Sequence, residues 1–99
     1  MNTNLELSIR ESIAVITGVL HHEVIDYFDQ SPETENARAL YFKLLMEYSI
    51  YHPAQLAHRY LVPVKKFQQY IANADMNLYR KCEQWIFKIT KPTYGEIIS

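Results

Sequence analysis

A short stretch in the second half of the chain combines side chains that suit contact with both phosphates and bases. On a helix beginning near residue 64, the outward positions would be Val64, Lys65, Lys66, Gln68 and Gln69. Lysine is a point charge that suits phosphate oxygens, whereas glutamine suits paired hydrogen bonds to adenine and valine can touch a thymine methyl group. We therefore predict that the two lysines contact phosphates, and that the two glutamines and the valine face base edges. Three further basic residues are predicted to contact phosphate, namely Arg59, Arg80 and Lys81.

Two short helices joined by a tight turn would hold this face outward. The first would span about residues 53–60 and begin with Pro53, where the missing N–H costs no hydrogen bond. Pro63 would end it, because proline disfavours the helical conformation in the residue before it. A second helix would restart at residue 63 or 64 and continue to about residue 74. The apolar positions that would face inward are Leu56, Ala57 and Tyr60 on the first helix and Phe67, Tyr70 and Ile71 on the second.

This layout, in which the second helix presents lysine and glutamine, is typical of a helix-turn-helix that reads DNA. Ordinary helical corners share the proline and these apolar spacings, so a corner without a role in DNA binding is the alternative. Val62 would fill the turn. Leu61 stands where such turns usually carry glycine, so the turn needs either a strained leucine or a slightly different geometry.

The two parts of the chain differ strongly in charge. Residues 1–36 carry one basic and seven acidic side chains, a net charge of −6, whereas residues 37–99 carry nine basic and four acidic side chains, a net charge of +5. A basic part that contains the predicted reading helix is what phosphate contact requires. A solvated surface with uneven charge is the alternative.

Three further helical segments are predicted around this pair. Residues 4–17 carry apolar side chains at a spacing of four, four and three, which predicts an amphipathic helix that Gly18 would end. A short helix would follow over residues 22–28, although one continuous helix over residues 4–28 is the alternative. Ser31 and Pro32 mark the start of a central core helix that reaches about Ile50. Asp75 would cap a closing helix over residues 76–89, before Pro92.

Composition favours a single all-α domain of five or six helices. The chain has 99 residues, of which 48% are hydrophobic, and it contains only two glycines. We assign residues 1–30 to acidic N-terminal helices, 31–51 to the central core helix, 53–74 to the helix-turn-helix and 75–91 to the closing helix.

Several classes of function are disfavoured by the residue types present. The histidines lack the partners of a metal site, two glycines cannot form a phosphate-binding loop, and no carboxylate pair shows a pocket, so neither an enzyme, a cofactor nor a small-molecule substrate is expected. Cys82, the only cysteine, falls on an apolar stripe and is predicted to be a buried thiol. The polar N-terminus and the lack of a run of 18 apolar residues predict a cytoplasmic protein without a membrane span.

The order of these helices resembles the C-terminal DNA-binding domain of the bacterial replication initiator DnaA and, more loosely, the Trp repressor fold. The resemblance covers roughly residues 8–90 and is carried by the succession SIRESIAVITG, HHEVIDYF, ARALYFKLLMEYS and HPAQLAHRYLVPVKKFQQYIANA. It implies binding of duplex DNA by a small transcription or replication regulator. Arg38 matches a basic residue near the start of the family's core helix, which implies a phosphate contact.

This chain departs from that family at the base-reading positions. The family enters its second helix with a glycine-glycine-arginine-aspartate-histidine-threonine stretch, whereas residues 61–66 read LVPVKK and are about one residue shorter. No base-reading residue carries over, and no nucleotide-binding module is present, so initiator activity is not implied. A helical protein–protein interaction module, which would use the acidic N-terminal helices to bind a partner or a second copy, is the rival prediction. A two-fold homodimer would set the spacing of DNA half-sites, but nothing in the sequence determines one.

Overall fold

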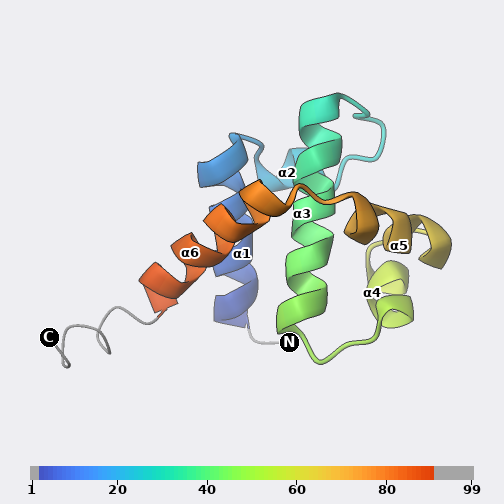
Figure 1. Cartoon of the computed structure of the whole chain (residues 1–99). Coiled ribbons are helices and arrows are strands. Elements are labelled where there is room, and N and C mark those ends of the chain that lie inside the picture. Colours follow the sequence, from blue (N-terminus) through green and yellow to red (C-terminus); the bar gives the residue numbers. More distant parts are fainter. Residues whose placement is uncertain (1–2, 91–99) are drawn as a thin grey trace, which may run out of the picture.

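The computed structural model describes residues 3–90 and consists, over that range, of six α-helices and no strand. The helices are α1 (Thr3–Thr17), α2 (His21–Val24), α3 (Pro32–Tyr48), α4 (Pro53–Arg59), α5 (Val64–Asn73) and α6 (Met76–Thr90). α1 and α6 lie side by side on one flank of α3, while α4 and α5 lie on the other (Figure 1). The prediction of an all-α fold is confirmed for this range. In the same range no helix is both long and apolar enough to cross a membrane.

The central helix, α3, is surrounded on several sides. Its predicted apolar stripe is buried at Leu40, Tyr41, Leu44 and Leu45, and Phe42 on another face is buried as well. These side chains belong to one hydrophobic cluster that contains buried residues from all six helices. A helix that buries adjacent faces can serve as the common support of its neighbours, because each neighbour packs on a different side of it.

The break between α1 and α2 is confirmed, so the alternative of one continuous helix is wrong. Gly18 has a positive φ of 78° and its N–H donates to the carbonyl of Ala14, as expected of glycine after a helix end. α2 ends at Val24 rather than at residue 28. In a continuing helix the N–H of Phe28 would donate to the Val24 carbonyl, but it donates to the side chain of Asp26 at 3.1 Å.

Both predicted helix starts are found, but the two caps differ. The Asp75 carboxylate accepts hydrogen bonds from the N–H groups of Asn77 and Leu78, which confirms it as the cap of α6. Ser31 precedes α3 as predicted, yet its side chain makes no capping bond and its hydroxyl donates to Asp29 at 2.8 Å. Hydrogen bonds from Ser31 and Thr34 lower the pKa of the Asp29 carboxyl below its ordinary value.

The closing helix α6 places Cys82 in the core, next to the carbonyl of Ser12 on α1. The Cys82 side chain is 0% exposed, which confirms the predicted buried thiol, and this burial raises the pKa of the thiol to about 11. Helix α3 ends at Tyr48, two residues before the predicted end. The predicted stop at Pro92 lies outside the described residues.

Candidate nucleic-acid interface

Helices α4 and α5 form the pair that was predicted from the apolar spacings. Pro53 is the first residue of α4, and α5 begins at Val64. The inward side chains of the pair, including that of Val62 in the turn, are buried. They are Leu56, Ala57, Val62, Phe67 and Tyr70, with Tyr60 and Ile71 partly buried beside them.

The turn between the two helices has the hydrogen bonds of a Schellman motif. The N–H of Val62 donates to the carbonyl of Ala57 at 2.9 Å, and the N–H of Leu61 donates to the carbonyl of His58 at 3.2 Å. Leu61 has a φ of 58°, which is a left-handed conformation, and this position of the motif is usually occupied by glycine. Of the two geometries considered from the sequence, the structure therefore has the strained leucine. Its side chain is 83% exposed and gains little burial in return.

The outward face of α5 carries the five side chains predicted there, and all five are exposed. They are Val64, Lys65, Lys66, Gln68 and Gln69. The helix itself contains no acidic residue. This face is therefore accessible to a polyanion, with Phe67 and Tyr70 holding the opposite face against the rest of the molecule.

Two surface hollows adjoin the turn, and both are lined by Leu61 and by a basic side chain. One, of about 190 Å³, is lined by Leu61, Tyr27 and Lys66 among others, and the second, of about 330 Å³, is lined by Leu61, Tyr27 and Arg59 among others. Arg59 and Lys66 thus both lie near the start of α5. Lys66 is exposed, and its ammonium lies 5.8 Å from the centre of the Tyr70 ring.

Arg59 is only half exposed and has an acidic neighbour that the sequence did not reveal. Its guanidinium lies 3.5 Å from the carboxylate of Glu6 in α1, which also accepts hydrogen bonds from Tyr60 and Arg10. Glu6 is buried, although it lies next to the apolar stripe of α1 and not on it. The acidic N-terminal helix therefore reduces the charge that Arg59 can offer to a phosphate.

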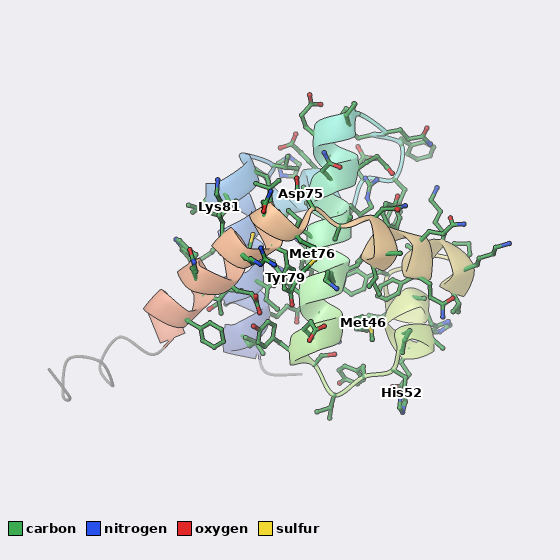
Figure 2. All side chains as sticks on the ribbon, viewed as in Figure 1. Met46, His52, Asp75, Met76, Tyr79 and Lys81 are labelled. Atoms are coloured by element: carbon green, nitrogen blue, oxygen red, sulfur yellow. The ribbon has the colours of Figure 1, made fainter. Side chains whose placement is uncertain are left out.

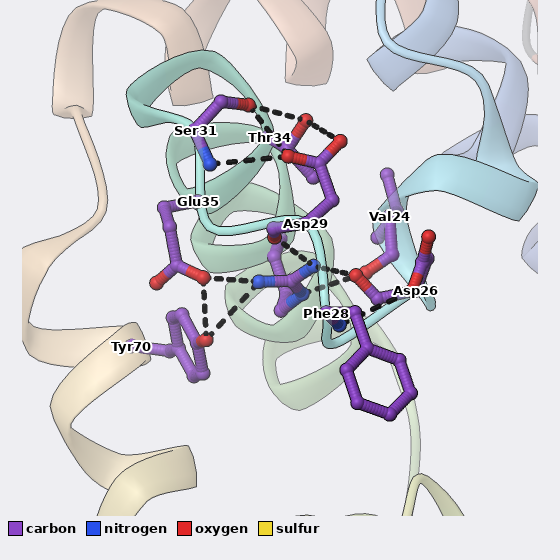
Figure 3. A network of polar contacts seen from close by, with 9 residues as sticks. Val24, Asp26, Phe28, Asp29, Ser31, Thr34, Glu35 and Tyr70 are labelled. Atoms are coloured by element: carbon purple, nitrogen blue, oxygen red, sulfur yellow. Dashed lines mark hydrogen bonds and ion pairs between the residues drawn. The ribbon is translucent and has the colours of Figure 1, made fainter.

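Arg38 is not available to contact phosphate, so that prediction is wrong. Its side chain is 0% exposed, the lowest value possible, and its guanidinium is enclosed by backbone carbonyls. Nε donates to the carbonyl of Val24 at 2.7 Å, and Nη2 donates to the carbonyls of Asp26 at 2.7 Å and Asp29 at 3.1 Å (Figure 3). The end of α2 and the loop that follows it thus direct three carbonyls at this cation, and that of Asp26 also accepts from the N–H of Asp29 at 3.0 Å.

The remaining polar contacts of Arg38 connect it to α5. Nη1 is ion-paired with Glu35 and donates to the hydroxyl of Tyr70 at 3.3 Å, while that hydroxyl donates to Glu35 at 3.1 Å (Figure 3). The rings of Tyr27 and Tyr70 lie 5.1 Å and 5.9 Å from the guanidinium carbon. Sequence reasoning missed this cluster, since Arg38 was assigned by resemblance alone and no local pattern marks it as buried.

Arg80 and Lys81 are exposed, but they belong to α6, which packs along α1. Figure 2 shows Lys81 on the far side of α3 from α5. The structure therefore does not bring all the predicted basic residues together. Those that lie close to the turn or on α5 are Arg59, Lys65 and Lys66.

The histidines are dispersed over the described part of the chain. His22, His52 and His58 are exposed, whereas His21 is half-buried with its ring centre 5.2 Å from that of Tyr41. Within the range 3–90 no group of three or more histidine, cysteine, aspartate or glutamate side chains could hold a metal ion.

Comparisons of this chain with protein-family models, with curated proteins and with solved structures found no match.

Proposed function

We propose that α4, the turn and α5 act as a helix-turn-helix, and that α5 binds in the major groove of duplex DNA. The observation that carries the proposal is the outward face of α5, where Val64, Lys65, Lys66, Gln68 and Gln69 are exposed together on a helix without acidic residues. The same helix is anchored from behind by Phe67 and Tyr70. The resemblance to DnaA-like and repressor-like domains supports a small regulator of transcription or replication.

The two kinds of side chain on this face have different tasks. Lys65 and Lys66, with a weaker contribution from Arg59 because of its Glu6 neighbour, neutralise phosphates and supply most of the affinity. Gln68 and Gln69 reach base edges, where the paired donor and acceptor of glutamine match adenine. Binding is therefore sensitive to salt, while sequence preference depends on the glutamines.

Titration of a fluorescent duplex at increasing salt concentration tests the proposal. Affinity should fall linearly with salt on logarithmic axes, with a slope of about −0.9 for each phosphate neutralised. The double variant Lys65→Ala, Lys66→Ala should reduce that slope by about two. A lack of binding at low salt by the unaltered chain would overturn the proposal. Selection of bound sequences from random duplex DNA then identifies the site.

A protein-interaction module is the second candidate, and the exposed apolar residues near the turn favour it. Ile25 and Leu61 are both exposed and line the same hollow, while Phe28, in the loop between α2 and α3, is 99% exposed. Large apolar side chains gathered at a surface often mark a protein contact. This candidate predicts no retention on DNA at low salt, together with a stoichiometric complex with a partner or a second copy in a sizing measurement.

A further inference from the structure

Contacts of two kinds, apolar and polar, connect the inner face of α5 to α3. Phe67 packs against Phe42 in the hydrophobic core, with ring centres 4.8 Å apart, and the Tyr70 ring packs edge-on against Phe42 at 5.4 Å. One turn further along α5, the Tyr70 hydroxyl donates to Glu35 and accepts from Arg38. An apolar ring contact tolerates small shifts, whereas hydrogen bonds weaken steeply when their geometry is disturbed. The polar contact is therefore the one that restricts the rotation and sliding of α5.

The Arg38 side of this contact is held in a fixed position. Its guanidinium is held by three backbone carbonyls of residues 24, 26 and 29 and by the carboxylate of Glu35. A fully buried cation with this many partners cannot move without leaving donors and acceptors unpaired. Tyr70 is thus bonded to a group that is fixed to the body of the molecule.

We propose that Arg38 and Tyr70 are positioning residues for α5, and that the position they impose determines how well the chain discriminates between base pairs. The inference rests on the proposed function of α5 and concerns residues that do not touch DNA themselves. Gln69 is the neighbour of Tyr70 in sequence, and Lys66 precedes Tyr70 by one helical turn. Paired hydrogen bonds to a base edge need accurate placement, whereas phosphate contacts between point charges tolerate displacement. Loss of the contact between Tyr70 and Arg38 should therefore reduce discrimination between base pairs more than it reduces affinity for DNA.

The test replaces Tyr70 by phenylalanine, which removes the hydroxyl and keeps the ring in the core. Tyr48→Phe is a matched control, because the Tyr48 hydroxyl donates to Glu83 and so joins α3 to α6 in the same chemical way. Amide hydrogen exchange on the free proteins is the first readout. Tyr70→Phe should accelerate exchange in α5 and leave α1 and α6 unchanged, while Tyr48→Phe should leave α5 unchanged.

Binding to the selected duplex and to a duplex with one base pair altered is the second readout. Tyr70→Phe should reduce the ratio of the two affinities by about tenfold, which lies within the contribution of one bidentate base contact. Affinity for random duplex at low salt should stay the same in both variants. Unchanged exchange in α5, or faster exchange with an unchanged affinity ratio, overturns the inference. If the unaltered chain does not bind DNA at all, the proposed function fails. The exchange measurement still shows whether the contact between Tyr70 and Arg38 positions α5.

Discussion

The N–H of Val62 donates to the carbonyl of Ala57 across a turn whose intervening residue, Leu61, is left-handed. An L-residue with a side chain is less stable in this conformation by roughly 1–2 kcal/mol, whereas glycine adopts it freely. Since Leu61 is largely exposed, its replacement loses little burial. After allowance for the greater freedom of glycine in the unfolded chain, Leu61→Gly should raise the free energy of unfolding by about 0.5–1 kcal/mol in a urea titration.

Leu20→Gly provides the control for this substitution. Leu20 is also an exposed leucine, but its φ of −78° suits any residue, so glycine there should lower the free energy of unfolding. If Leu61→Gly destabilises the protein as much as Leu20→Gly, the left-handed leucine carries no strain.

Removal of Arg38 should destabilise the fold because it breaks the network that the loop between α2 and α3 depends on. Arg38→Ala leaves Glu35 without its cation and removes a donor from three backbone carbonyls, of which only that of Asp26 is also seen to accept from a backbone N–H, that of Asp29. We expect a loss of about 3–5 kcal/mol in the free energy of unfolding, measured in urea. Arg80→Ala, at an exposed position, should change it by less than about 0.5 kcal/mol. Similar losses in the two variants would contradict the structural role of Arg38.

Cys82 should make stability depend on pH in the alkaline range. Burial raises the pKa of its thiol from 9.0 to about 11, so between these values the unfolded chain releases the proton and the folded chain keeps it. The unfolded state then binds fewer protons, and stability is full below pH 9 and falls as the pH rises to 11. The difference in unfolding free energy between the unaltered chain and Cys82→Ala should fall by roughly 2 kcal/mol over this range. Tyrosine ionisation affects both proteins and so cancels in this difference. A difference that stays constant over this pH range would show that Cys82 does not contribute to the pH dependence of stability.

The positions of two exposed lysines predict different effects on DNA affinity. Lys66 lies on α5, whereas Lys81 lies across α3 from it (Figure 2). Lys66→Ala should weaken binding to all sequences about equally and reduce the salt slope by about one, because one phosphate contact is lost. Lys81→Ala should change neither quantity. Equal effects of the two substitutions would indicate that DNA does not dock on α5.

Gln68 should contribute to sequence preference and little to affinity. Gln68→Ala is expected to lose about 1–3 kcal/mol of discrimination at one base pair, while binding to random duplex stays nearly constant. Gln84→Ala, on the exposed side of α6, is the matched control and should leave the preference unchanged. Repeated selection from random duplex DNA with each variant measures the effect, and an unaltered preference in Gln68→Ala would exclude this residue from base contact.

Local patterns in the sequence were sufficient to predict most of the helices and the outward face of α5. Helical periodicity, prolines at helix starts and Gly18 act within a few residues, so they predict where helices begin, end and bury a face. The stripe of α3 and the exposure of Lys65 and Gln68 follow from this local geometry. Local geometry was less informative about the end of α2. There the Val24 carbonyl accepts from the distant Arg38 side chain, and the N–H of Phe28 donates to Asp26 instead.

The roles of Arg38 and Glu6 were decided by the tertiary structure alone. Arg38 meets Tyr70, 32 residues away, and Glu6 meets Tyr60, 54 residues away. No periodicity connects residues at such distances, and a charged side chain is expected at the surface unless partners enclose it. Only packing of the helices around α3 brings those partners together. The same packing separates Lys81 from α5, because the direction in which each helix leaves its turn is set by the core it covers and not by its own sequence.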